Sequence, residues 1–416
     1  MKNLKGAAIF GQSGGPTSVI NGSAAGVFTE ALKQELITGV YGAAHGIKGI
    51  LDERFYDISK EDPAELELLK YTPSSALGSV RYKLKDAAKD DTDYKRLLEV
   101  FKKYDIRYFF YNGGNDSMDT CNKVSKYLKA AGYDCNVIGV PKTIDNDLFG
   151  TDHCPGFGSA AKYISTTLME LNLDAKVYNT GLVCIVEIMG RNAGWLTASA
   201  ALAGYKGLGA DLIYLPEVPF SVDKFVDDVK KVCEKNNNKA IVAVSEGIKN
   251  SDGKYVGEFM ASSTDLFGHA QLGGVGAQLG DIIKTRLGVK VRAIEFSLMQ
   301  RCAAHIASGT DVEESFDAGR EAVKYAVNGE TDQMVAFERT YDENGDYVCK
   351  TKLLPLAQVA NTEKTIPADW INADGTGLTD DFIQYALPLI QGETKLPKED
   401  GLPRFAKLKK VWATAK

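Results

Sequence analysis

Residues that bind soft metals are scarce in this sequence. Its 416 residues include four histidines and seven cysteines, and no two cysteines stand at CxxC or CxxxC spacing. The histidines are scattered, without the close pairing of a zinc-binding motif. A zinc site is therefore not expected. The odd number of cysteines is typical of reduced, mostly buried thiols.

Long apolar runs are also missing. The N-terminal stretch MKNLKGAAIFGQSGG has too short an apolar run for a signal peptide, and no later stretch approaches the length of a membrane span. We therefore expect a cytoplasmic protein without a membrane partner. The formal net charge is -6, which argues against nucleic acid as a partner, because phosphate backbones are held by clustered Lys and Arg. An anionic small substrate would need a locally basic pocket.

The sequence otherwise has an ordinary globular composition, with 44% hydrophobic and 25% charged residues. Its length exceeds what one core usually serves, so two domains are the simpler expectation. Short β-branched or aromatic runs alternate with amphipathic stretches, which is typical of a parallel sheet covered by helices. The predicted strands are Ala7 to Phe10, Arg107 to Tyr111, Asn136 to Val140, Leu182 to Glu187, Asp211 to Leu215, Ala240 to Val244 and Val289 to Phe296.

This pattern predicts an α/β fold of two doubly wound, mostly parallel-sheet domains with the active site between them. We assign residues 1–157 plus about 305–416 to the first domain and residues 158–304 to the second. Past Glu330 we expect a short strand, MVAFER, a turn, DENGD, and mixed helical segments that complete the first domain.

The loop after the first predicted strand, GQSGGPT, is rich in glycine and leads directly into a predicted helix. Gly14 and Gly15 would let backbone N–H groups approach an anion, and the helix N-terminus would add partial positive charge. A tight turn without a ligand is an alternative. The same residues match the G-x-S-x-G nucleophile elbow, with Ser13 as the nucleophile of a serine hydrolase.

A second glycine pair, Gly113 and Gly114, follows the strand RYFFY and leads to Asn115 and Asp116. Two such units predict a divided phosphate cradle. The Walker A pattern GxxxxGK[ST] is absent from the sequence.

The third loop, PKTIDND, carries two carboxylates, Asp145 and Asp147, just after Lys142 and Thr143. Carboxylates at this spacing can divide two roles: one accepts a proton from an attacking hydroxyl, and the other holds a metal or orients its neighbour. An ordinary turn or a calcium loop is the alternative, although the Gly and distal Glu of an EF-hand are lacking.

Arginines stand at further strand ends and helix starts. Arg191 follows Met189 and Gly190, whereas Arg292 and Arg301 bracket the stretch VRAIEFSLMQR. Because the planar guanidinium can donate two hydrogen bonds to phosphate oxygens, the three arginines predict a pocket for a phosphorylated substrate.

Together these loops resemble those of the phosphofructokinases, in particular the pyrophosphate-dependent branch. The likeness covers most of the chain from Gly6 to Gly329, with the motifs in the same order. It implies transfer of a phosphoryl group to the 1-hydroxyl of fructose 6-phosphate, with Mg2+ as cofactor. The first domain would bind the donor and the second the sugar phosphate.

The resemblance also implies roles for individual residues. Asp145 matches the proton acceptor, with Thr143 and Asp147 beside it. The positions that match the sugar-phosphate site are Met189, Gly190, Arg191, Glu246, Arg292 and Arg301. The donor is expected at the two glycine pairs and at one arginine, namely Gly14, Gly15, Gly113, Gly114 and Arg81 of LGSVR.

Two residues separate the branches of the family. ATP-dependent members carry glycine at both positions where this chain has Asp116 and Lys142. The resemblance therefore implies a reversible reaction with pyrophosphate, which yields fructose 1,6-bisphosphate in glycolysis. An ATP-dependent enzyme of the same fold, the serine hydrolase and a non-catalytic regulatory subunit are the alternatives.

Three positions depart from the family pattern. Asn115 replaces the usual aspartate after Gly-Gly, so contact with Mg2+ would run through an amide oxygen or a water. Leu182 stands where many members carry an arginine that reaches across a subunit interface. Leu298 stands where histidine or tyrosine is usual. We expect a homo-oligomer, although Leu182 removes one cross-subunit phosphate contact.

Overall fold

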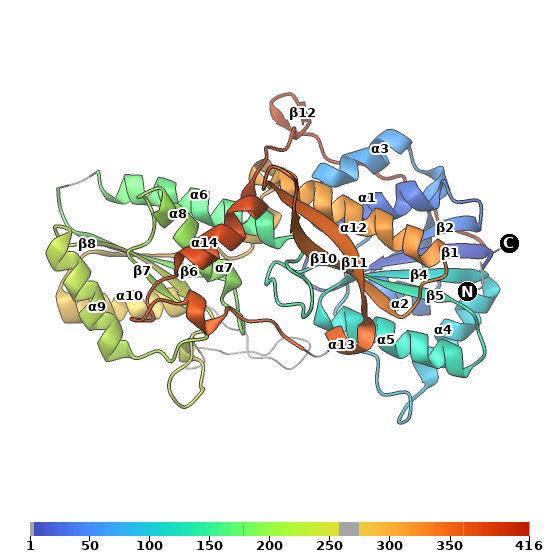
Figure 1. Cartoon of the computed structure of the whole chain (residues 1–416), viewed down its shortest axis with the longest axis horizontal. Coiled ribbons are helices and arrows are strands. Elements are labelled where there is room, and N and C mark those ends of the chain that lie inside the picture. The colour runs from blue at the N-terminus through green and yellow to red at the C-terminus, as the bar shows by residue number, and fades with distance from the viewer. Residues whose placement is uncertain (1–3, 178, 258–273, 361, 416) are drawn as a thin grey trace.

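The computed structural model describes residues 4–177, 179–257, 274–360 and 362–415, and builds them mainly around two β-sheets (Figure 1). In the larger sheet the strand order is β11-β10-β5-β4-β1-β2-β3. Its strands are β1 (Gly6–Gln12), β2 (Ile37–Ala43), β3 (Phe55–Asp57), β4 (Ile106–Gly113), β5 (Asn136–Pro141), β10 (Gln333–Tyr341) and β11 (Tyr347–Pro355).

The smaller sheet has the order β7-β8-β6-β9. Its strands are β6 (Leu182–Ile188), β7 (Leu212–Tyr214), β8 (Lys239–Ser245) and β9 (Val291–Glu295). All its described pairings are parallel. In the larger sheet only the two outermost described pairings, β2 with β3 and β10 with β11, are antiparallel. The predicted α/β fold with two mostly parallel sheets is confirmed, and each predicted strand overlaps an observed one.

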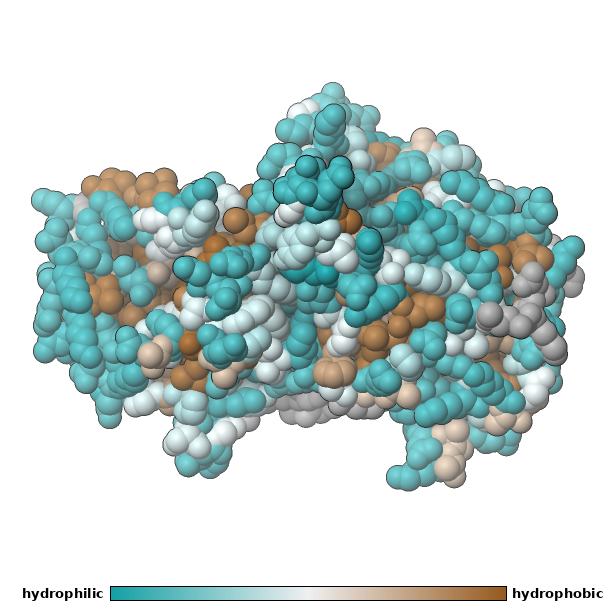
Figure 2. Space-filling model, viewed as in Figure 1, coloured by the Kyte–Doolittle hydropathy of each residue, from teal (hydrophilic) through white to brown (hydrophobic). Residues whose placement is uncertain are grey.

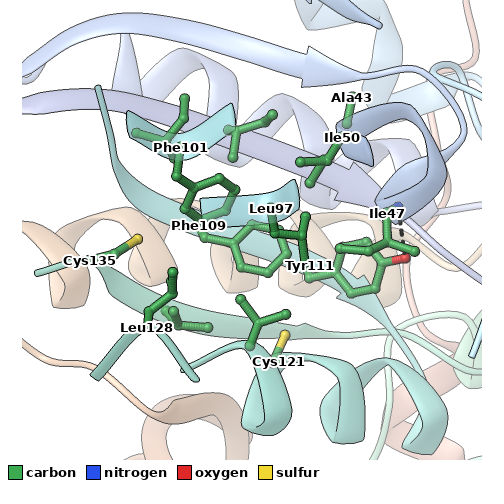
Figure 3. Close-up of a cluster of buried hydrophobic side chains, with 14 of the residues drawn as sticks. Ala43, Ile47, Ile50, Leu97, Phe101, Phe109, Tyr111, Cys121, Leu128 and Cys135 are labelled. Carbon is green, nitrogen blue, oxygen red and sulfur yellow. Dashed lines mark hydrogen bonds between the residues drawn. The ribbon is translucent and has the colours of Figure 1, made fainter. Parts of the chain in front are cut away.

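Side chains of the larger sheet alternate between two helical layers, because successive residues of a strand point to opposite faces. On one face Phe109 and Tyr111 pack with helices α2 (Gly46–Leu51), α4 (Thr92–Lys103) and α5 (Asn115–Ala130) (Figure 3). On the other face Phe10 and Phe110 pack with α1 (Ile20–Ala31) and α12 (Gly309–Val327). Helices therefore cover both faces, as in a doubly wound fold.

The smaller sheet is covered in the same way. Cys184 and Val186 point toward α6 (Phe157–Ala175), α7 (Trp195–Ala198) and α8 (Ala200–Tyr205). Val183 and Ile185 point toward α9 (Val222–Lys235) and α10 (Val275–Leu287). No helix in the described ranges combines the length and apolar character that crossing a bilayer requires.

The C-terminal part of the chain departs from the expected short strand followed by helices. The turn DENGD is the tip of a hairpin between β10 and β11, and β11 was not predicted. Beyond it, α13 (Leu356–Val359) packs under the larger sheet, whereas α14 (Asp380–Ala386) packs against the helices of the smaller sheet. Trp412 then returns to β3, where it stacks on Tyr56 with 4.6 Å between ring centroids.

The tail therefore packs in the surroundings of both sheets. The assignment of residues 1–157 plus 305–416 and residues 158–304 to two domains stays a prediction.

Candidate active site

A cavity of about 790 Å³ lies among loops that follow strands of both sheets. From the larger sheet it receives the loops after β1, β4 and β5, and from the smaller sheet the loops after β6, β8 and β9. Ligands of doubly wound sheets bind at such carboxyl ends. The lining includes most of the predicted site residues: Gly14, Gly15, Arg81, Gly114, Asn115, Asp116, Lys142, Thr143, Asp145, Asp147, Met189, Arg191, Glu246 and Arg301.

Three predicted residues are not part of this lining. A Cβ on Gly113 would lie 2.0 Å from Ser117 Oγ, so this glycine allows the first turn of α5 to pack closely. Gly190 adopts φ +135°, which favours glycine, and its N–H donates to Glu246 Oε1 over 3.2 Å. Arg292 lies on β9, an edge strand of the smaller sheet, and is exposed.

The first glycine loop differs from its prediction at the helix. Helix α1 begins at Ile20, several residues after the glycine pair, so the expectation that the loop enters a helix directly is wrong. Helix α5 instead begins at Asn115, immediately after β4, with Gly114 as its N-cap. The partial positive charge of a helix N-terminus is therefore supplied to the cavity by α5.

The glycine pair of the first loop brings two cations close to its backbone. A Cβ on Gly14 would lie 3.3 Å from Lys142 Nζ, and one on Gly15 would lie 3.1 Å from Arg301 Nη1. Lys142 Nζ donates a hydrogen bond to the Gly15 carbonyl oxygen over 2.7 Å. Any side chain at these two positions would press on the cations.

Lys142 is buried, with an exposed fraction of 3%, and burial changes the pKa of its side chain. Removal from water lowers the pKa of its ammonium to about 8, although the nearby carboxylates of Asp145 and Asp147 act in the opposite direction. Arg81 and Arg301 repel one another, and burial together with this repulsion lowers the pKa of Arg301. The cavity thus gathers the positive charge that an anionic substrate needs in an acidic protein.

The two carboxylates of the TIDND loop, residues 143–147, line the cavity, and the asparagine between them anchors the loop. Asn146 is fully buried with φ +54°. Its Nδ2 donates to Tyr385 Oη over 2.8 Å, and its Oδ1 accepts from the N–H of Cys154 over 2.9 Å. These bonds anchor Asn146 in the interior while Asp145 and Asp147, on either side, line the cavity.

Both carboxylates lose solvent, and burial raises the pKa of Asp145 and of Asp147. Repulsion from Glu246 adds to the rise at Asp145, and repulsion from Asp145 adds to it at Asp147. The Asp145 N–H donates to Thr143 Oγ1 over 3.1 Å, which fixes the start of the loop. A carboxylate with a raised pKa is a better proton acceptor than a solvated one.

Asn115 lies beside Asp147, with 3.3 Å between Asn115 Nδ2 and Asp147 Oδ2. Rotating the amide by 180° lets Nδ2 donate to the carbonyl oxygens of Val359, over 3.3 Å, and Thr362, over 3.1 Å. Oδ1 then faces the Asp147 carboxylate. Two oxygens directed at one another in this way suit a hard cation between them.

A buried ionic network supports the segment that follows the TIDND loop. His153 Nδ1 lies 2.8 Å from Asp152 Oδ1, and His153 Nε2 lies 2.6 Å from Glu314 Oε2. Burial alone would lower the pKa of His153, but the two carboxylates outweigh it and raise the pKa to about 9. Cys349 also approaches His153 and Glu314, within 4.8 Å. Because both ring nitrogens already face carboxylates, we interpret the cluster as an ion-pair network around a charged imidazolium.

Several lining residues were not predicted from the sequence as site residues, among them Tyr82, Asn192 and Glu363. Glu363 comes from the tail, where no motif marks it. Of the three departures from the family pattern, Leu298 lines the cavity and is 54% exposed, whereas Leu182 begins β6 and packs against the core.

The described cavity lining does not provide the histidine that a serine hydrolase would need beside Ser13. Ser13 Oγ donates to the carbonyl oxygen of Val80 over 3.4 Å, and no histidine occurs among the described residues that line the cavity. A nucleophile elbow also needs a helix directly after the serine, whereas α1 begins only at Ile20.

Comparison with known proteins gives a consistent result. A family model described as phosphofructokinase matches residues 7–296. A pyrophosphate–fructose 6-phosphate 1-phosphotransferase of Halomonas elongata is 45% identical, covering 97% of this chain and 96% of the relative, and one of Xanthomonas campestris is 46% identical, covering 98% and 97%. The crystal structure of a pyrophosphate-dependent phosphofructokinase from Nitrosospira multiformis superposes with a TM-score of 0.90 at 41% identity, covering 99% of each chain.

Proposed function

Because the chain belongs to the phosphofructokinase family, we propose that it transfers a phosphoryl group reversibly from pyrophosphate to the 1-hydroxyl of fructose 6-phosphate. The product is fructose 1,6-bisphosphate, and the reaction belongs to glycolysis. The names of its relatives support this proposal. The observation that carries it is the buried Lys142, whose ammonium lies in the cavity between the first glycine loop and the two aspartates.

Asp145 removes the proton from the 1-hydroxyl, so that the oxygen can attack the terminal phosphorus of pyrophosphate. Thr143 holds the loop, and Asp147 lies beside the base. Lys142 and Arg81 offset charge on the two phosphates of the donor, and the backbone at Gly14, Gly15 and Gly114 leaves room for them. Gly113 contributes indirectly, because it lets the first turn of α5 pack closely. The departing phosphate is stabilised by the same cations, which makes the reverse reaction accessible.

The loops of the smaller sheet hold the sugar phosphate. Met189 and Arg191 after β6 and Glu246 after β8 contact the sugar, and Arg301 reaches its phosphate. Gly190 supports them through its N–H, which donates to Glu246 Oε1. In this proposal residues 1–157 plus 305–416 bind the donor and residues 158–304 bind the sugar phosphate. The cavity lining supports the division, because the two groups of loops enter it from different sheets.

We assign Mg2+ to Asn115 and Asp147. The fit rests on the amide of Asn115, which can turn Oδ1 toward the Asp147 carboxylate while its nitrogen bonds the carbonyl oxygens of Val359 and Thr362. When bound, Mg2+ would neutralise charge on the phosphates of the donor. An amide contributes no charge, so we expect weaker metal binding than an aspartate at position 115 would give.

A homo-oligomer is part of the proposal. Arg292 lies on an exposed edge strand and does not line the cavity of its own chain. In this position it would be available to a second copy. Large apolar side chains are exposed elsewhere around the smaller sheet, including Leu173 at 57% and Val177 at 70%, and a hydrophobic patch lies over α6 in Figure 2. Because glycolysis takes place in the cytoplasm, we propose that location.

One assay tests the function directly. Purified protein is given fructose 6-phosphate and Mg2+ with either pyrophosphate or ATP, and formation of fructose 1,6-bisphosphate is coupled to NADH oxidation. We expect the higher kcat/KM with pyrophosphate. A higher kcat/KM with ATP would replace the pyrophosphate reaction with the ATP-dependent alternative, and no turnover with either donor would favour the regulatory subunit.

A further inference from the structure

Glu363 lines the cavity, and neither the proposed reaction nor the proposed donor choice gives its carboxylate a role. The other acidic side chains there are Asp116, Asp145, Asp147 and Glu246. Glu363 comes from the tail, after α13, and enters the cavity between loops of the two sheets.

The backbone at Glu363 is tied to the TIDND loop. The N–H of Lys364 donates to the Asp147 carbonyl oxygen over 2.8 Å, and Glu363 forms an isolated antiparallel bridge with Leu148. Lys364 also extends its side chain inward, where Nζ donates to the carbonyl oxygen of Asp152 over 2.6 Å. The segment therefore lies against the residues that follow Asp145.

On its other side, the segment is tied to the loops of the smaller sheet. Trp195 Nε1, at the start of α7, donates to the Lys364 carbonyl oxygen over 2.9 Å. Asn192 Nδ2 donates to Glu363 Oε1 over 3.2 Å. Asn192 directly follows Arg191, and its Oδ1 accepts a hydrogen bond from Tyr255 Oη over 2.9 Å. Glu363 thus connects two loops, the Arg191–Asn192 segment through its side chain and the end of the TIDND loop through its backbone. In the proposed reaction the reacting groups meet between these loops.

We propose that Glu363 is a positioning residue, whose carboxylate holds the Arg191–Asn192 segment at a set distance from the TIDND loop so that the bound sugar presents its 1-hydroxyl to Asp145. The inference rests on the proposed function. Small displacements of reacting groups have large kinetic effects, since a misplacement of about 1 Å can lower a rate by about 100-fold. An anchor that acts through alignment therefore affects turnover and sugar binding more than donor binding.

Three single variants and one double variant separate alignment from charge. Glu363→Ala removes the acceptor for Asn192, so we expect a fall in kcat of at least about 10-fold and a several-fold rise in the KM for fructose 6-phosphate, with the KM for pyrophosphate within about 2-fold. Glu363→Gln retains an acceptor oxygen without the charge and should recover most of the lost kcat. Asn192→Ala should reproduce the Ala variant, and the double variant should be no worse than either single one.

Glu343→Gln, at the exposed tip of the β10–β11 hairpin, is the matched control and should leave both kinetic constants unchanged. Thermal unfolding of each variant, together with calorimetric titration of fructose 6-phosphate, separates loss of alignment from loss of fold. Wild-type kinetics in Glu363→Ala would overturn the proposal, and so would equal losses in the Ala and Gln variants with a normal Asn192→Ala enzyme. Failure of the proposed function itself would appear as absence of turnover in the wild-type protein.

Discussion

Lys142 donates a hydrogen bond from its buried ammonium to the carbonyl oxygen of Gly15, across 127 residues of sequence. The contact joins the loops after β1 and β5, two strands that are separated in the sheet by β4. It places a positive charge against the backbone where the donor phosphates are proposed to lie. Lys142 is consequently both a link between loops and a positive charge that acts to lower the pKa of the Asp145 carboxyl.

Replacing Lys142 with Met should remove this charge while keeping the apolar stem. A charge-assisted contact contributes roughly 1.5 to 3 kcal/mol, so kcat/KM for pyrophosphate should fall by about 10-fold to 150-fold. Steady-state kinetics with pyrophosphate as the varied substrate measure the change. Lys350→Met, at an exposed position on β11, is the control. An unchanged kcat/KM in the Lys142 variant would remove Lys142 from the donor site.

Donor choice should depend on Asp116 together with Lys142. Asp116 lies in the first turn of α5, with its carboxylate 3.6 Å from Lys83 Nζ. Its bulk and negative charge would occupy the space into which ATP continues beyond its β-phosphate. We expect Lys142→Gly to impair the pyrophosphate reaction, and the double variant with Asp116→Gly to show measurable ATP use without recovery of the pyrophosphate rate.

The matched control for donor choice is Lys83→Met, which removes the ion-pair partner of Asp116 but leaves its carboxylate in place. This variant should remain unable to use ATP efficiently. Efficient ATP use by the unmodified enzyme would contradict the proposed role of both residues.

Replacing Asp145 with Ser should lower kcat by at least about 100-fold, with a smaller effect on KM, because general-base catalysis contributes about 100-fold to 10,000-fold. Asp145→Asn keeps the shape and should be equally impaired, which distinguishes the missing proton acceptor from a packing defect. Single-turnover phosphoryl transfer, followed by rapid quench, is the measurement. Near-normal turnover in both variants would assign the base elsewhere.

The two arginines of the sugar-phosphate prediction differ in place, because Arg301 lines the cavity and Arg292 does not. Arg301 lines the cavity and reaches Gly15, so Arg301→Ala should raise the KM for fructose 6-phosphate by about 10-fold to 150-fold. Arg292 is exposed on β9 and does not line the cavity of its own chain, so in the proposed oligomer it would reach the sugar phosphate of a neighbouring copy. Arg292→Ala should therefore raise the same KM in the oligomer.

Complementation checks the shared site. Inactive Asp145→Ser protein is mixed with Arg292→Ala protein, and the subunits are exchanged under mild denaturant. Mixed oligomers should regain activity above the sum of the parents, because some sites combine an intact base with an intact arginine. A normal sugar KM in Arg292→Ala would exclude this residue from substrate binding.

The stability of the fold should decrease at alkaline pH through His153. Its pKa is raised to about 9, above the ordinary value of 6.5, so its contribution is complete below pH 6.5 and is lost as the pH rises through about 9. The difference corresponds to roughly 3 kcal/mol of unfolding free energy at most. Urea unfolding of wild type and His153→Gln between pH 6 and 10 should show a steeper decline for wild type.

Titration of the His153 ring by NMR in the folded wild-type protein is an independent check that does not depend on the stability of the variant. A ring that deprotonates near pH 6.5 would contradict the ion-pair interpretation, because an imidazole held between Asp152 and Glu314 should retain its proton well above that pH.

Most of the fold and the cavity could be predicted because the signals are local. Most of the chemistry-bearing loops follow a strand of buried β-branched or aromatic residues, so the sheets bring these loops together once the strands are recognised. β2 was missed because its sequence, ITGVYGA, is interrupted by two glycines, and β3 because it has only three residues. β11 is a half-exposed edge strand with lysines among its apolar residues, which obscures the alternation.

Two errors have causes that local sequence does not reveal. The start of α1 was placed too early because Thr17 Oγ1 accepts a hydrogen bond from the N–H of Val19, a local turn that competes with helix formation. Glu363 was missed because its place depends on a bridge to Leu148, a hydrogen bond from Asn192 and the bond from the Lys364 N–H to Asp147, all remote in sequence. No spacing rule connects such residues.

The late position of the tail has a consequence for protein synthesis. Tyr385 supports Asn146, and Trp412 and Ala413 attach to β3, with the Ala413 N–H donating to the Phe55 carbonyl oxygen over 2.8 Å. After the ribosome has synthesised the TIDND loop, it must still translate more than half of the given sequence before these contacts can form. Nascent and prematurely terminated chains that end before Tyr385 therefore lack this support for the TIDND loop.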